Sequence, residues 1–139
     1  MTDTPTTDAV ATRELRIVDE QGRERLLLTV REGAPAVLLL REDGQPGASL
    51  RLDAAGRPAV RLANPDPAWP GASLEVDGKG VHVKFDRPGG ASAYLFLNNA
   101  GGSGVVLIDT AGKRRLDAAV AADGSSRIVR YGEDGKPLA

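Results

Sequence analysis

The chain contains no cysteine and only one histidine, His82, among its 139 residues. Without cysteine, it has neither a disulfide framework nor a thiolate ligand for a metal ion. His82 alternates with Val81 and Val83, which is the pattern of a solvated side chain on a half-buried strand. No G-x-S-x-G motif supplies a nucleophile for this histidine to activate. The sequence therefore predicts no metal, no cofactor and no catalytic residue, and we expect a non-enzymatic protein.

Aromatic residues are scarce, with two Phe, two Tyr and one Trp. The apolar interior must therefore consist mainly of Val, Leu and Ile, which suit β-strands. Trp69 lies between two prolines in the longest irregular segment, and Tyr94 lies in a predicted strand. An exposed Trp or Tyr can stack on a sugar ring or anchor a protein partner. We take Trp69 and Tyr94 as the candidate binding residues, with a packed lid over the end of the fold as the alternative for Trp69.

The chain also lacks an excess of acidic or basic residues, and it lacks long apolar runs. The net charge is −1, with acidic and basic residues interspersed, which argues against a nucleic-acid partner. No apolar run approaches the roughly 20 residues of a membrane-spanning helix, so we expect no membrane insertion. The first twelve residues lack the charged and apolar regions of a signal peptide. The default expectation is a cytoplasmic protein, with export by another route left open.

A short turn motif recurs along the chain, and residues 50–62 show it most clearly. Two apolar residues alternate with polar ones, then Asp53 is followed by Gly56, and the alternation resumes. Asp and Asn side chains bond to nearby backbone amides, and Gly adopts positive φ without a steric penalty. The glycines of the eight copies are Gly22, Gly44, Gly56, Gly80, Gly89, Gly101, Gly112 and Gly135. Eight such turns predict a series of β-hairpins.

The pattern predicts an all-β protein of about eleven short antiparallel strands. We place them at 14–18, 24–30, 36–41, 48–52, 58–63, 72–76, 80–86, 92–97, 104–109, 113–120 and 126–131. A sandwich, prism or meander is the expected architecture, with a β-trefoil as second choice. Residues 113–122 also have a composition that permits a helix. Residues 1–12 are interpreted as a disordered arm, and residues 13–139 as a single domain.

The strands differ in how many of their faces are apolar. Between residues 50 and 85 only one side of each strand is apolar, whereas both sides are apolar in 26–28, 37–40, 94–97 and 105–108. A strand that is apolar on both sides needs two covering layers, and the chain offers no amphipathic helix to provide one. We therefore expect a homo-oligomer, with a trimer among the options, in which these strands lie near the subunit interface.

The pattern L-x-L-x-D-x-x-G-x-x-R-x-x-L, found at residues 50–62 and again from Ile17 to Leu26, resembles short tandem β-repeat proteins of high-GC bacteria. That resemblance implies a β scaffold that assembles as a trimer or fibre, and it supplies no catalytic residues. Together with the apolar strands, it predicts a structural or protein-interaction module that self-assembles through its sheet faces. The alternative function is a carbohydrate-binding module that uses Trp69 and Tyr94.

Overall fold

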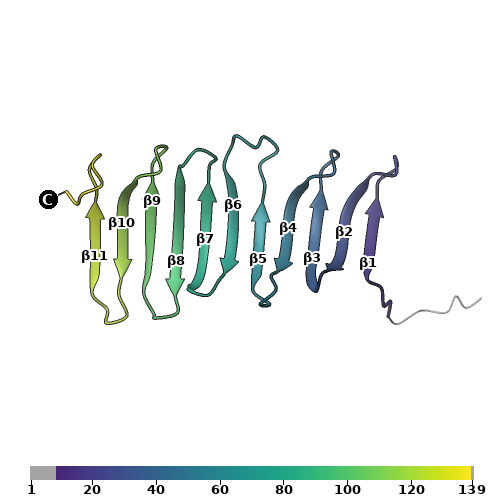
Figure 1. Ribbon diagram of the computed structural model, residues 1–139, viewed down its shortest axis with the longest axis horizontal. Helices are drawn as coiled ribbons and strands as arrows, with labels where there is room; N and C mark the ends of the chain where they lie inside the picture. Colours follow the sequence, from purple (N-terminus) through teal and green to yellow (C-terminus); the bar gives the residue numbers. More distant parts are fainter. Residues whose placement is uncertain (1–8, 139) are drawn as a thin grey trace, which may run out of the picture.

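The computed structural model describes residues 9–138, and these residues form one antiparallel sheet of eleven strands with no helix. The strands lie in the sheet in the order of the sequence, each paired with the next (Figure 1). They are β1 Glu14–Val18, β2 Glu24–Arg31, β3 Ala34–Leu40, β4 Pro46–Leu52, β5 Pro58–Leu62, β6 Gly71–Val76, β7 Gly80–Asp86, β8 Ser92–Asn98, β9 Ser103–Ile108, β10 Arg114–Val120 and β11 Ser126–Arg130.

This arrangement confirms the predicted all-β fold and identifies it as an open meander of hairpins, so the trefoil alternative is wrong. Residues 114–120 form strand β10, which excludes the helix that their composition permits. Pairing on both sides explains this outcome, because β10 is hydrogen-bonded to both β9 and β11. Of the predicted arm, residues 1–8 lie outside the described residues, and residues 9–12 carry no strand or helix.

Six of the eight predicted turns share one hydrogen-bonding geometry, and Asp53 to Arg57 illustrates it. The Gly56 amide donates to the Asp53 carbonyl at 2.9 Å, and the Asp53 carboxylate accepts the amides of Ala55 and Arg57 at 2.8 and 3.0 Å. Gly56 has φ 76°, as the left-handed position of a type I turn with a following bulge requires. All eight glycines predicted to lie in turns have positive φ.

One of the eight turns lies one residue later than the motif predicts. Asp86 was expected to open the turn, but it remains in the ladder of β7 and pairs with Ser92. The turn begins at Arg87, whose carbonyl accepts the Gly90 amide at 3.2 Å. Two consecutive glycines made this shift possible, because Gly89 and Gly90 both adopt positive φ.

Strand register sorts the side chains onto two faces, because directly paired residues point to the same side of a sheet. One face, here called the apolar face, has three rows of side chains that cross the sheet. Its middle row is Leu15, Leu28, Val37, Leu50, Val60, Leu74, Val83, Leu95, Val105, Ala118 and Ile128. The middle row is apolar on all eleven strands.

The other two rows of the apolar face lie on either side of the middle row, above and below it as drawn in Figure 1. The upper row is Ile17, Leu26, Leu39, Ala48, Leu62, Ala72, Phe85, Ala93, Leu107, Leu116 and Arg130. The lower row, which begins at β2, is Val30, Pro35, Leu52, Pro58, Val76, Val81, Leu97, Ser103, Val120 and Ser126. The opposite side of the sheet is here called the polar face.

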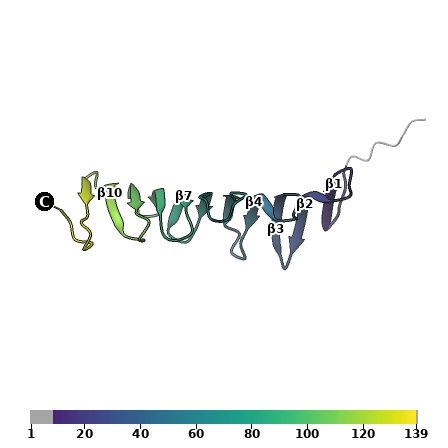
Figure 2. The ribbon, with the colours of Figure 1, turned by 90° about the horizontal axis from the view of Figure 1, so that it is seen from above.

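The sheet is a single layer along its whole length, as Figure 2 shows from above. Only two large apolar side chains among the described residues are buried, Leu27 and Val106. The molecule exposes 10187 Å², whereas a compact monomer of 14.5 kDa exposes about 6,900 Å². The fold therefore has no enclosed core within one chain. Among residues 9–138, no helix is long and apolar enough to cross a membrane.

Candidate functional site

The apolar face is unusual because it exposes many large apolar side chains. Large apolar side chains that are more than one-third exposed lie almost entirely on it, and the only ones elsewhere are Val10, Val18, Trp69 and Leu138. Leu62 is 54% exposed, Phe85 is 55% exposed and Leu95 is 56% exposed. A monomeric soluble protein rarely exposes a contiguous apolar patch larger than a few hundred Å². The apolar face is therefore the first candidate for a functional surface.

The polar face is built differently, because its central strands carry charged and hydroxyl side chains that pair across the sheet. Arg61 contacts Glu75 at 3.1 Å, and His82 lies 3.7 Å from the other oxygen of the same carboxylate. Ser49 and Ser73 flank Arg61 on the neighbouring strands. These groups are compatible with water, so the central part of the polar face needs no covering layer.

A carboxylate at the edge of the polar face organises strands β1 and β2. Glu14 accepts hydrogen bonds from Thr29 at 3.1 Å and Arg31 at 3.0 Å, and it also pairs with Arg16. Hydrogen bonds from Arg31, Arg16 and Thr29 lower the pKa of Glu14 from its ordinary 4.5 to about 2. The carboxylate therefore stays ionised in the folded protein well into the acid range.

The apolar side chains of the polar face lie where the sequence shows strands that are apolar on both sides. Leu27 on β2 and Val106 on β9 point to this face, and they are the two most buried apolar residues, with exposures of 5% and 3%. Neighbouring side chains of the same sheet already cover them. On the strands that are apolar on both sides, Leu39, Leu95 and Leu97 of the apolar face remain more than half exposed. The exposed surface is the apolar face, including its one-sided middle strands.

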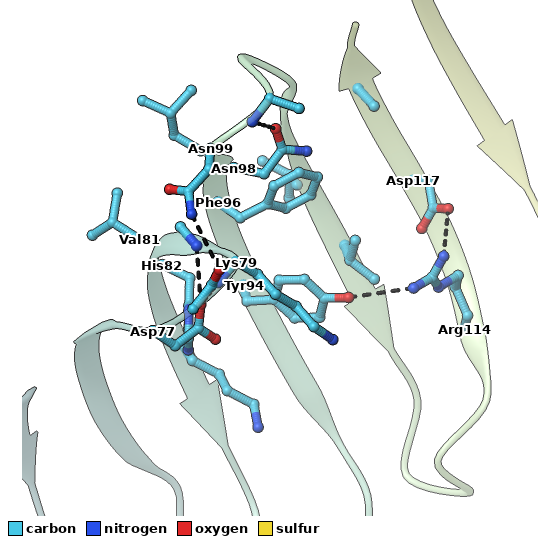
Figure 3. Close-up of a pocket in the computed structure, with 18 of the residues that line it drawn as sticks. Asp77, Lys79, Val81, His82, Tyr94, Phe96, Asn98, Asn99, Arg114 and Asp117 are labelled. Carbon is cyan, nitrogen blue, oxygen red and sulfur yellow. Dashed lines mark hydrogen bonds and ion pairs between the residues drawn. The ribbon is translucent and has the colours of Figure 1, made fainter. Parts of the chain in front are cut away.

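A hollow of about 830 Å³ indents the polar face over β7 to β10 (Figure 3). Tyr94 and Phe96 form its aromatic wall, with ring centroids 6.1 Å apart and planes at 46°. Phe96 pairs with Gly104 on β9, where the ring would lie 3.1 Å from an added Cβ. Glycine therefore makes room for the ring to lie across the neighbouring strand.

A polar network closes the far side of this hollow. Asp117 is almost fully buried, and its Oδ2 accepts hydrogen bonds from Arg114 Nη1 and from the Tyr131 hydroxyl, both at 3.0 Å. Arg114 also reaches the Tyr94 hydroxyl at 3.3 Å. The second carboxylate oxygen of Asp117 is buried without a partner. The hollow thus combines aromatic rings with charged groups, which is the mixture of a ligand-binding site.

Trp69 lies elsewhere, in the loop between β5 and β6. The Trp69 amide donates to the Asp66 carbonyl at 3.1 Å, and Arg41 holds the start of the loop through the carbonyls of Asn64 and Pro65 at 3.3 and 3.2 Å. Trp69 is 58% exposed, so it is not a packed lid. It lines a different hollow from Tyr94, and the structure does not bring the two predicted binding residues together.

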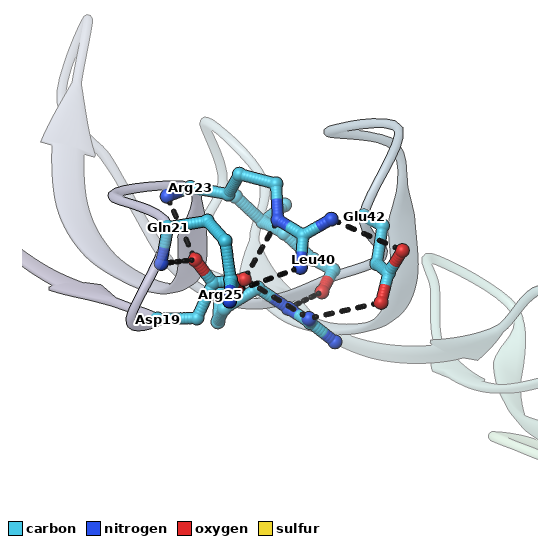
Figure 4. Close-up of polar contacts among 6 residues, drawn as sticks. All are labelled: Asp19, Gln21, Arg23, Arg25, Leu40 and Glu42. Atoms are coloured by element: carbon cyan, nitrogen blue, oxygen red, sulfur yellow. Dashed lines mark hydrogen bonds and ion pairs between the residues drawn. The ribbon is translucent and has the colours of Figure 1, made fainter.

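The first predicted turn shows that its acidic residue has a structural role (Figure 4). Asp19 accepts the amides of Gln21 and Arg23 at 3.0 and 2.9 Å, and the Arg23 side chain at 2.8 Å. Burial alone would raise the pKa of Asp19, but these hydrogen bonds outweigh it and lower the pKa below its ordinary value. Arg23 also bridges to Glu42 on the next upper turn at 3.1 Å. Such ion pairs link successive hairpins.

We next consider His82 and the acidic side chains of the described residues as possible metal ligands. His82 pairs in the ladder with Glu75 and Phe96. Across residues 9–138, no three His, Asp or Glu side chains are grouped closely enough to hold a metal ion. Sequence analysis did not identify Phe96, Arg114 or Asp117 as site residues. Phe96 could have been found from its position two residues after Tyr94, on the same face of one strand.

No protein-family model matches this chain, and no curated protein is significantly similar in sequence.

Proposed function

We propose that this protein is a non-enzymatic structural module that self-assembles by covering its apolar face with a second copy of the same chain. The observation that carries the proposal is the middle row of the apolar face, which is apolar on every strand of the sheet. A single layer with so little buried apolar surface gains stability chiefly when this face is removed from water.

The size of the face supports a stable dimer. Eleven strands at about 4.8 Å each span roughly 50 Å, and three rows of side chains span roughly 20 Å. Two such faces bury on the order of 2,000 Å² in total, which is the lower end of the range for obligate homodimers. Sheets that pack face to face lie about 10 Å apart, with interdigitated side chains.

The chemistry of the face favours a second copy over a different protein. Arg130 is the only charged side chain in its three rows. A surface without a pattern of charges offers little to select one foreign partner over another. A second copy presents an equally large and equally apolar surface, and association covers both at once.

Sedimentation equilibrium at micromolar concentration tests the proposal. We expect twice the monomer mass of 14.5 kDa. Leu74→Asp places a charge in the middle row and should weaken association by more than 100-fold, because a buried unpaired carboxylate costs several kcal/mol. Ser73→Asp is the matched control, because Ser73 is the preceding residue of β6 on the polar face. A monomeric wild-type protein would overturn the proposal.

Carbohydrate binding is the second candidate, and the hollow that contains Tyr94 favours it. The hollow lies on the polar face, so face-to-face association leaves it open. Aromatic rings beside charged side chains suit the apolar and hydroxyl sides of a sugar. We expect Tyr94→Ala to abolish glycan-array binding and Trp69→Ala to leave it unchanged. A wild-type protein that binds no glycan would refute this candidate.

A further inference from the structure

Side-chain size alternates along the upper row of the apolar face. From β3 to β9 the row reads Leu39, Ala48, Leu62, Ala72, Phe85, Ala93 and Leu107. The large residues stand on odd-numbered strands and the alanines on even-numbered strands. The large residues are 40–55% exposed, so they form ridges separated by troughs two strands apart.

The lower row alternates in the opposite sense. The bulkier residues Val30, Leu52, Val76, Leu97 and Val120 stand on even-numbered strands, and Pro35, Pro58, Ser103 and Ser126 stand on odd-numbered strands. Val81 on β7 is the exception, since it equals its neighbour Val76 in size. A ridge at the upper end of a strand therefore corresponds, in most of the sheet, to a trough at its lower end.

We infer that two copies pack about a twofold axis that runs along the sheet, perpendicular to the strands, so that each strand lies over its own copy. This inference rests on the proposed self-assembly through the apolar face. Rotation about that axis brings the upper row of one copy over the lower row of the other. Leu62 then faces Pro58 of the second copy, and Ala48 faces Leu52. Ridges enter troughs on β3 to β6, β8 and β9.

The other face-to-face arrangement, with the axis parallel to the strands through β6, fits less well. It places the upper row over the upper row, so Leu39 on β3 meets Leu107 on β9 and Ala48 on β4 meets Ala93 on β8. Ridge would then lie on ridge and trough on trough. Such contacts leave cavities beside overpacked positions, and both cost stability.

Distance measurement between spin labels tests the inferred axis, and a chain without cysteine permits single labels at chosen sites. Arg16→Cys on β1 and Arg127→Cys on β11 place labels at opposite edges of the polar face, away from the inferred contact. We expect both homodimers to give distances of roughly 20–30 Å, the sheet spacing of about 10 Å plus the reach of two labels.

The alternatives give different results. An axis parallel to the strands separates both label pairs by roughly 50 Å, the width of the sheet. Edge-to-edge association gives one short and one much longer distance. Two distances of roughly 50 Å from a protein of dimer mass would overturn the inferred axis and leave the proposed self-assembly intact. The edge-to-edge result would overturn both, because it leaves the apolar face uncovered. A monomer mass of 14.5 kDa would overturn both.

Discussion

Phe85 on β7 and Ala72 on β6 lie directly opposite each other in the upper row of the apolar face. The Phe85 ring is 55% exposed and stands beside a single methyl group. This pair forms the steepest step between a ridge and a trough on the surface. The proposed interface should therefore be sensitive here to a change in side-chain volume.

Truncation of this ridge should weaken self-association. Phe85→Ala removes apolar area worth about 1.5–3 kcal/mol, and the twofold axis applies the loss twice. We expect the dimer dissociation constant from sedimentation equilibrium to rise roughly 100-fold or more. Ala72→Phe should also weaken the dimer, because it fills a trough that receives a ridge. Lys84→Ala, the polar-face neighbour of Phe85, is the control. An unchanged constant in Phe85→Ala would contradict the interface.

The turn between β2 and β3 contains the only described non-glycine residue with positive φ. Glu32 has φ 51° and Gly33 has φ 77°, which is the geometry of a type I′ turn. Asn tolerates this geometry better than Glu, so Glu32→Asn should raise the free energy of unfolding by about 0.5–1 kcal/mol. Chemical denaturation at one fixed protein concentration measures the change. Glu20→Asn, in a turn without this strain, should be close to neutral, and equal effects in the two variants would argue against the explanation.

Two glycines test whether the repeated turns depend on positive φ. Gly56 has φ 76° with no neighbouring atom within 4 Å of an added Cβ, so Gly56→Ala meets backbone strain and no clash. We expect a loss of about 1–2 kcal/mol in the free energy of unfolding. Gly78 lacks positive φ, and its added Cβ would meet only the flexible end of Arg57 at 3.4 Å. Gly78→Ala should therefore cost clearly less in the same denaturation experiment.

Acid should destabilise the fold in part through Glu14. Because the hydrogen bonds of Arg31 and Arg16 lower its pKa from 4.5 to about 2, the unfolded chain binds a proton before the folded protein does. The stabilising contribution of Glu14 is thus complete above pH 4.5 and is lost as the pH falls toward 2. Thermal midpoints measured across this window should fall more steeply for wild type than for Glu14→Gln. Parallel curves for the two proteins would refute this role.

Much of the fold could be predicted because its determinants are local. Asp53 and Gly56 specify a turn from their own side-chain chemistry, and the alternation around them specifies strands. Seven of the eight repeats lie between consecutive strands, and together with the alternation they placed the strands within one or two residues. The shifted turn at Arg87 shows the limit, since two adjacent glycines permit either register and strand pairing selects one.

The sites were less predictable because they depend on which strands become neighbours. Tyr94 was identified as a candidate, but its contact with Arg114, which in turn pairs with Asp117, arises from strands that the sequence does not place side by side. Trp69 was identified with Tyr94, and the structure places them in separate hollows. The strands that are apolar on both sides predict an interface, and that prediction stays open: Leu27 and Val106 on the polar face are covered within the chain, whereas Leu95 on the apolar face is exposed.

The sequence by itself determined that this chain reverses direction repeatedly as paired strands, because turn chemistry and period-two alternation act over a few residues. Only the tertiary structure decided that the hairpins remain in one layer, and that Leu15 through Ile128 align in an unbroken apolar row. Alignment of that kind depends on the register between strands. A shift of one residue in a single strand would send its apolar side chains to the opposite face.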